Sequence, residues 1–161
     1  MCTQITYTEI MPPEKLKQGP LPVEDRAFYG LVWAGNTLTA RVGQALMRRH
    51  DLTLSWFEVL LWLSDQDSPV SVSGLGACTM LSRSQVSRVL DAMQDRGLIT
   101  RTPSPSDARS VAVALTPAGR ELFTDADATR RESLAEVFTG RLGTDDLTAL
   151  IRVWQKLKAT G

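Results

Sequence analysis

The stretch from Ser82 to Gly119 carries, in close succession, the signals of a capped helix, two short strands and the start of another helix. Ser82 and Gln85 form an S-x-x-Q capping box, and the apolar residues that follow repeat at helical spacing: Val86, Val89, Leu90 and Met93. Gly97 suits the end of this helix, because glycine adopts a positive φ without strain. The sequence then predicts a hairpin with strands at 98–101 and 111–115, joined by a loop rich in proline and serine.

Amphipathic helices are also predicted upstream of this stretch. A long helix is expected over 23–51, and the next helix is capped either by Thr53 or by Ser55, which begins an S-x-x-E box. Ser71 is expected to cap a short helix that ends near Thr79. This short helix contains two glycines, so tertiary packing must stabilise it.

Two further helices are predicted downstream of the hairpin. Thr116 is a good N-cap and Pro117 is pre-organised for the first helical position, so a helix is expected from there to about Gly140. Thr144 is expected to cap the last helix. That helix carries an apolar stripe at three- and four-residue spacing: Leu147, Leu150, Ile151, Trp154 and Leu157.

This order of elements predicts a fold that is mainly α with a small β-hairpin. Two short helices joined by a tight turn and followed by a hairpin are the pattern of a winged helix-turn-helix. We expect an extended or disordered proline-rich arm at 1–22, a dimerisation helix at 23–51, a winged helix-turn-helix domain at 52–115, and C-terminal dimerisation helices at 116–161. Dimerisation is expected because the lobe is too small to cover the apolar faces of both terminal segments; a three-helix layer within one chain is the alternative.

The net charge of the chain is zero, but the charges are unevenly distributed. Residues 1–78 hold six basic and eight acidic groups, and residues 121–161 hold six and seven. The segment 79–120 holds six arginines, no lysine and three aspartates. Because the arginine fork matches phosphates and guanine edges, this segment remains a candidate for contacting DNA. With so little overall attraction, non-specific binding should be weak.

The predicted helix after Ser82 presents polar groups that can read DNA. A recognition helix contacts base edges with its N-terminal residues, and here these are Arg83, Ser84, Gln85 and Arg88. Arginine pairs with guanine and glutamine with adenine, while serine hydroxyls and free amides at the helix start bind phosphates. The alternative is an ordinary capped surface helix.

The loop of the predicted hairpin carries Asp107 and Arg109 among small residues. Such a loop can enter a minor groove, where narrow A·T tracts attract arginine, and Asp107 can orient Arg109 through an ion pair. The alternative is a solvated loop with an incidental charge pair.

Taken in order, these segments resemble the MarR family of bacterial transcriptional regulators over about residues 25–158. The most specific match is the D-x-R of 107–109 followed by L-T-P-A-G at 115–119; Leu52-Thr53 with Trp56, and Ser82 through Ile99, also match. The resemblance implies a homodimer that binds palindromic double-stranded DNA. It places Ser82 and the helix residues named above in the major groove, and Arg109 with Asp107 in the minor groove. The chain departs from the family at Leu75-Gly76, where Leu-Ala is usual, and at Cys78.

The resemblance also implies a sensor function, because many members of the family bind small aromatic or phenolic molecules. Candidate aromatic residues for that site are Phe28, Tyr29, Trp33, Trp56 and Trp62, with core packing as the alternative for each. A redox-responsive regulator that uses Cys78 is a second alternative, although neither Cys2 nor Cys78 matches the sensing position of the relatives that respond to oxidants.

Other classes of protein are not expected. The sequence lacks a glycine-rich phosphate loop and a nucleophile motif, so we predict no catalytic residues and no cofactor. A single histidine and two distant cysteines disfavour a metal site. No apolar run approaches the roughly 18 residues of a membrane span, and no signal peptide is evident, which predicts a cytoplasmic protein. A winged-helix module that binds proteins instead of DNA remains the alternative from another class.

Overall fold

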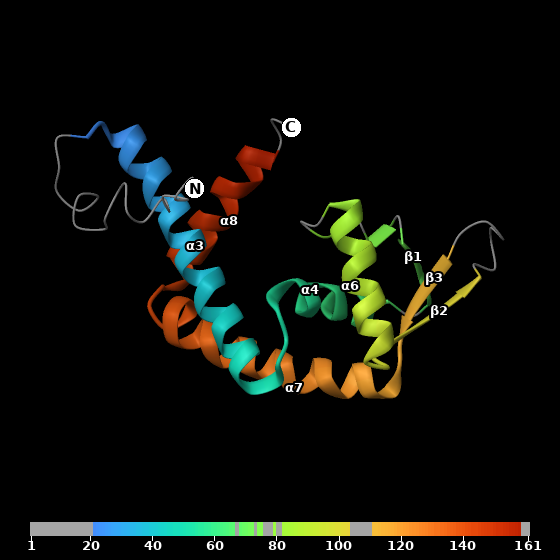
Figure 1. The fold of residues 1–161 in the computed structure, drawn as a ribbon. Helices are drawn as coiled ribbons and strands as arrows, with labels where there is room; N and C mark the ends of the chain where they lie inside the picture. The colour runs from blue at the N-terminus through green and yellow to red at the C-terminus, as the bar shows by residue number, and fades with distance from the viewer. Residues whose placement is uncertain are drawn as a thin grey trace, which may run out of the picture. The chain divides into compact units, whose positions relative to one another are not determined.

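The computed structural model describes residues 21–66, 68–72, 74–75, 79, 82–103 and 111–158. The chain divides into two compact units, Met1–Arg41 and Val42–Gly161, and the boundary lies within the first long helix (Figure 1). Most of the predicted N-terminal arm lies outside the described residues.

Helix α3 spans Val23–His50, which confirms the predicted long helix. Acidic residues occupy its first turn, while Arg48, Arg49 and His50 occupy its last turn, and both placements favour the helix dipole. In the first unit, Phe28 and Leu31 are exposed. In the second unit, Val42 and Leu46 of the same helix are buried.

Helix α4 spans Leu54–Ser64 and is capped by Thr53, whose Oγ1 accepts a hydrogen bond from the Trp56 N–H at 3.2 Å. The alternative cap at Ser55 is wrong, because Ser55 lies inside the helix. The buried face of α4 includes Phe57, Leu60 and Leu63.

Helix α6 spans Arg83–Asp95 and begins with the predicted capping box, in which both hydrogen bonds are present. Gly97 lies two residues beyond the end of the helix and has a φ of 68°. The Gly97 N–H donates to the Gln94 carbonyl at 2.8 Å and the Leu98 N–H to the Met93 carbonyl at 3.0 Å. This pair of bonds is a Schellman motif, and it turns the chain directly into the hairpin.

The sheet has three strands, one more than the sequence predicted. Strands β2 (Ile99–Pro103) and β3 (Val111–Leu115) form the expected antiparallel hairpin. Strand β1 (Val70–Ser71) pairs with the other edge of β3, which gives the order β1-β3-β2. Two residues are too few to show an alternating pattern, so this strand depends on its partner rather than on a local signal.

The short helix after β1 is described only in part. Ser71 Oγ accepts a hydrogen bond from the Gly74 N–H at 3.1 Å, as its predicted role in capping requires. Residues 76–78, which include Cys78, lie outside the described residues.

Helix α7 spans Pro117–Leu134 and starts against the end of α6. Thr116 Oγ1 accepts a hydrogen bond from the Gly119 N–H at 3.0 Å and donates one to the Gly97 carbonyl at 2.7 Å. A Cβ at Gly119 would overlap the carbonyl oxygen of Leu98. The T-P-A-G segment therefore joins the start of α7 closely to the turn between α6 and β2.

The C-terminal segment differs from prediction in two details. The helix expected to reach about Gly140 continues beyond α7 as a π-helical turn, η1, at Ala135–Thr139. Helix α8 spans Thr144–Lys158, so Thr144 is inside the helix and its predicted role as cap is wrong. Instead, the Gly143 carbonyl accepts the first helical hydrogen bond, from the Leu147 N–H, and the Gly143 N–H donates to the Asp146 carboxylate at 3.0 Å.

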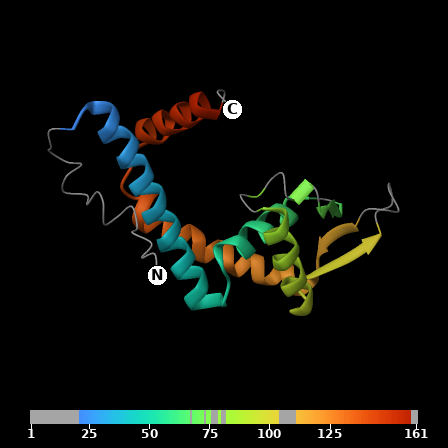
Figure 2. The ribbon, with the colours of Figure 1, turned by 45° about the horizontal axis from the view of Figure 1, so that its top comes forward.

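The hydrophobic core of the second unit gathers side chains from α3, α4, α6, the sheet and α7; its largest buried members are Phe57, Leu46, Leu52, Leu60, Leu75, Leu90 and Met93. Helix α4 contacts both α6 and α7 (Figure 2). These elements form the predicted winged helix-turn-helix, and the fold class is confirmed. Over the described ranges, no helix is both long and apolar enough to cross a membrane.

Candidate nucleic-acid interface

The N-terminus of α6 presents exposed polar side chains on a rigid cap. Ser82 Oγ accepts a hydrogen bond from the Gln85 N–H at 3.4 Å, and Gln85 Oε1 accepts one from the Ser82 N–H at 2.9 Å. Ser84 Oγ lies 3.2 Å from Ser82 Oγ. Because the cap uses Gln85 Oε1, the side-chain amide offers its N–H donors more freely than its acceptor. In this rotamer Gln85 therefore favours an acceptor such as a phosphate or a base N7 over the paired contact with adenine.

Arg88 lies one turn further along the exposed side of α6. No ion pair joins it to another of the residues that the structure describes. Arg83 is the first residue of α6, but its side chain lies outside the description. Ser82, Ser84, Gln85 and Arg88 thus lie together at one helix end, where the backbone amides also favour anions.

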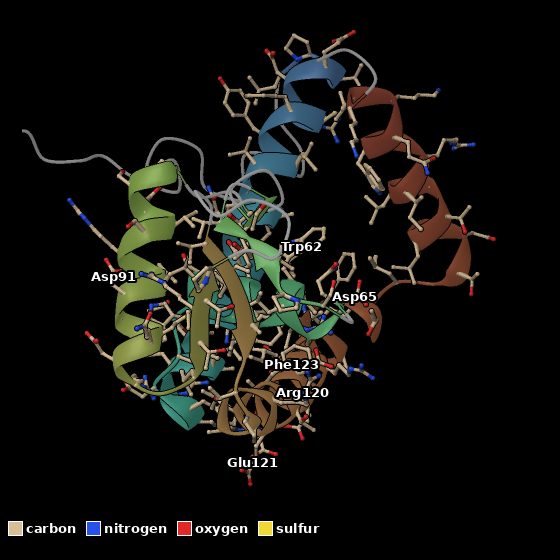
Figure 3. The ribbon with its side chains drawn as sticks, turned by 90° about the vertical axis from the view of Figure 1, so that its right-hand side faces the viewer. Trp62, Asp65, Asp91, Arg120, Glu121 and Phe123 are labelled. Atoms are coloured by element: carbon tan, nitrogen blue, oxygen red, sulfur yellow. The ribbon has the colours of Figure 1, made fainter. Side chains whose placement is uncertain are left out.

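The exposed side of α6 changes charge along its length. After Arg88 it carries Asp91 and then Asp95, at helical spacing. Asp91 is labelled on α6 in Figure 3, and its Oδ1 accepts a hydrogen bond from Arg101 Nη1 of β2 at 2.7 Å. Asp95, and to a lesser degree the paired Asp91, disfavour phosphates in the C-terminal half, so the N-terminal half is the end that can approach DNA.

The hairpin lies against α6, with contacts between α6 and β2. Its last described pair is Pro103 opposite Val111, so the two ends of the connecting loop leave the sheet side by side. Asp107 and Arg109 belong to that loop and lie outside the described residues. Their minor-groove role stays a prediction.

The aromatic residues proposed for a ligand site fall in different units. Tyr29 and Trp33 belong to the first unit, where Phe28 packs edge-on against Tyr29 at 5.3 Å between ring centroids. Trp56 and Trp62 lie on α4 in the second unit. Trp62 is 38% exposed, whereas Trp56 packs against the core beneath a guanidinium. A shared ligand site for these residues remains a prediction.

Three basic residues have structural roles that the sequence did not predict. Arg96, at the end of α6, donates a hydrogen bond from Nη1 to the Asp51 carbonyl at 3.0 Å. At the end of α3, Arg49 pairs with Glu132 of α7 at 2.5 Å, and His50 Nε2 lies 2.8 Å from Thr129 Oγ1. These contacts span long sequence separations, so no local motif could have revealed them.

One acidic group has a shifted titration. Burial raises the pKa of the Glu58 carboxyl of α4 above its ordinary value. The parts of the chain described here hold no cluster of three or more histidines, cysteines and carboxylates that could bind a metal.

Comparison with known proteins points to one family. A family model described as the MarR family matches residues 50–110. The chain is 26% identical over 117 residues to the HTH-type transcriptional repressor IacR of Pseudomonas putida, covering 73% of this chain and 69% of the repressor. It is 34% identical to an uncharacterised HTH-type transcriptional regulator of Mycobacterium bovis, of whose length the match spans only 60%.

Solved structures of the same fold cover most of the chain. AbsC, a MarR family transcriptional regulator from Streptomyces coelicolor, superposes with a TM-score of 0.82 at 24% identity, covering 89% of this chain and 97% of AbsC. Sco3205 from the same organism, solved in complex with DNA, gives 0.80 at 18% identity, covering 86% and 91%. BpsR of Bordetella bronchiseptica, whose DNA binding is regulated by 6-hydroxynicotinic acid, gives 0.74 at 26%, covering 87% and 98%.

Proposed function

Because this chain belongs to the MarR family of transcriptional regulators, which are not enzymes, we propose that it is a sequence-specific repressor that binds a palindromic operator as a homodimer. The observation that carries this proposal is the capped N-terminus of α6, where Ser84, Gln85 and Arg88 are exposed next to the hairpin. We also propose a cytoplasmic location, because the duplex DNA that such a regulator would bind lies there.

In the proposed complex, the first two turns of α6 enter the major groove. Arg88 and Arg83 are the candidates for guanine, while Ser82, Ser84 and the free amides of the first turn bind phosphates. Arg109, oriented by Asp107, enters the flanking minor groove.

Homodimerisation is supported by the apolar side of α8. Ile151, Trp154 and Leu157 are each about half exposed or more in the single chain, at 49%, 51% and 60%. An apolar stripe of this size is normally covered by a partner. A twofold dimer with one recognition helix per subunit matches half-sites about one helical turn apart, in a duplex of roughly 20 bp.

Repression and ligand response rest on the relatives. IacR is named as a repressor, and DNA binding by BpsR responds to an aromatic acid. A small aromatic or phenolic acid is therefore the effector class that we propose, with Tyr29, Trp33, Trp56 and Trp62 as candidate contacts. It acts only if it binds the DNA-competent and DNA-incompetent states with different affinities. The proposed effector class is tested by adding a panel of aromatic acids to the protein bound to fluorescent operator DNA and measuring release of the DNA. If no acid in the panel releases the DNA, the result contradicts the proposed effector class.

The DNA-binding proposal is tested by fluorescence anisotropy with the protein's own promoter region. We expect salt-sensitive binding that a scrambled duplex of equal composition does not match. Arg88→Ala should lower affinity by about 1–3 kcal/mol, as loss of a base contact does, and Arg109→Ala by a similar amount. Arg48→Ala is the matched control and should leave the affinity unchanged, since Arg48 is an exposed arginine in the last turn of α3, outside the proposed DNA-binding surface. Equal affinity for the scrambled duplex would contradict the proposal.

A further inference from the structure

Besides their shared buried core, two hydrogen-bonded contacts at different points along the hairpin join it to α6. At the base, the Leu98 N–H donates to the Met93 carbonyl at 3.0 Å. Three residues further along β2, Arg101 Nη1 donates to Asp91 Oδ1 at 2.7 Å. A strand rises about 3.3 Å per residue, so the two ties are separated by about 10 Å along the hairpin. The buried packing of Ile99 and Val113 on the same core as Leu90 and Met93 holds the base of the hairpin against α6, and the Arg101–Asp91 tie adds a fixed point about 10 Å further along that refines the angle between the hairpin and α6.

The side chain of Arg101 is held in a costly position. It is only 25% exposed, and its Nε is buried without a hydrogen-bond acceptor among the described residues. A buried donor without an acceptor is destabilising, so such a group in a folded protein calls for an explanation. A methionine or leucine would fill this space without that cost. The guanidinium does what they cannot, because it reaches the carboxylate of Asp91 from the strand.

Asp91 is a carboxylate on a helix that we propose to contact DNA, where a negative charge is unexpected. It lies one turn after Arg88 on the exposed side of the helix that we propose for the major groove. An unpaired carboxylate there would repel the phosphates on either side of the groove. Its pairing with Arg101 reduces that repulsion and turns the charge into a link to the hairpin.

We propose that Arg101 and Asp91 are positioning residues that set the hairpin at the angle to α6 at which its loop reaches the minor groove beside the half-site. This inference rests on the proposed function, because it assumes that α6 and the hairpin read the same DNA. Its consequence is specific: the ion pair controls discrimination at the flanks of the operator, whereas α6 alone controls discrimination within the half-site.

The test measures two affinity ratios by fluorescence anisotropy for each full-length protein. The flank ratio compares the operator carrying A·T flanks with the same operator carrying G·C flanks, and the half-site ratio compares intact and altered half-sites. For the unmodified protein we expect both ratios to be roughly tenfold or more. Asp91→Asn and Arg101→Gln should bring the flank ratio close to one and leave the half-site ratio unchanged. Asp91→Glu, which keeps a carboxylate, should restore much of the flank ratio.

Asp95→Asn is the matched control. Asp95 is an exposed carboxylate one turn further along α6, and no ion pair joins it to another described residue. Its neutralisation removes the same charge, so it should tighten binding to every duplex while both ratios stay unchanged. Thermal unfolding is followed for all variants to show that each remains folded. If the ion pair only stabilised the fold, its loss would lower the unfolding temperature and both affinity ratios together.

Several results would overturn the proposal. It is wrong if Asp91→Asn keeps the flank ratio, if both ratios fall in parallel, or if the unmodified protein has a flank ratio of one. In this last case a large half-site ratio still supports the proposed function. If the unmodified protein shows neither ratio above one, the proposed function itself fails.

Discussion

The guanidinium of Arg96 lies over the indole ring of Trp56, with its central carbon 5.2 Å from the ring centroid. The same guanidinium binds the Asp51 carbonyl and lies 3.6 Å from the Asp51 carboxylate. Asp51 forms the corner between α3 and α4 and has a φ of 50°, which is unusual for a residue other than glycine. One side chain thus fastens the end of α6 to the corner where α3 turns into α4.

Removal of this side chain should destabilise the protein. Arg96→Ala eliminates the cation–π contact and the hydrogen bond, and we expect the free energy of unfolding to fall by about 1–2 kcal/mol. Urea unfolding followed by circular dichroism measures this change. Arg48→Ala, at an exposed arginine of α3, should alter the free energy by less than about 0.5 kcal/mol. A variant at Arg96 as stable as the unmodified protein would show that the corner is held by other contacts.

Gly119 should tolerate no side chain. Alanine there places a Cβ against the Leu98 backbone carbonyl, and backbone cannot move aside as a flexible side chain can. We expect Gly119→Ala to lower the free energy of unfolding by more than about 2 kcal/mol. Gly35→Ala is the control, because a Cβ at Gly35 on α3 meets no atom within 4 Å, and its higher helix propensity should leave stability equal or improved. Similar behaviour of both variants would refute the packing argument.

Stability should depend on pH through Glu58. Burial raises the pKa of this carboxyl in the folded state, so the folded chain retains a proton that the unfolded chain releases. The stabilisation from the protonated form is complete below the ordinary carboxyl pKa, which the unfolded chain has, and it is lost as the pH rises through the higher pKa of the folded state. Glu58→Gln should remove this decline, as measured by thermal unfolding between about pH 4 and pH 7. Glu121→Gln, at an exposed site on α7, serves as control (Figure 3). A decline that persists in Glu58→Gln would assign it to another group.

The apolar stripe of α8 should hold the proposed homodimer together. Trp154→Glu places a charge on that stripe, where a partner would bury it, and the cost of burying an unpaired charge should dissociate the dimer. Sedimentation equilibrium then reports a monomer. Gln155→Glu adds the same charge to the next residue, off the stripe, and should leave the dimer intact. A dimeric Trp154→Glu protein would place the interface elsewhere.

Local sequence signals predicted the individual helices and turns well, but they did not predict the long-range contacts between these elements. The Ser82 cap, Gly97 and the Thr116-Pro117 start were predictable because each satisfies backbone groups within a few residues. Strand β1 was missed because it is short and exists only by pairing with β3.

The candidate site shows the same division. The polar residues that begin α6 could be predicted from the sequence to lie together, since they share one helix end. It could not show that Gln85 Oε1 is used by the cap, nor that Arg101 reaches Asp91, because rotamers and long-range pairs depend on the packed structure. The role of Arg109 remains a prediction from the motif.

If the proposed function is right, a symmetric dimer reads DNA through two copies of the α6 N-terminus. Sequencing of the DNA that the purified protein selects from a random duplex pool tests it most directly. We predict enrichment of an inverted repeat whose half-sites are centred about one helical turn, roughly 10 bp, apart. Selection with Arg88→Ala should lose preference at defined positions in each half-site. A pool with no enriched motif, or with a motif lacking twofold symmetry, would contradict the account.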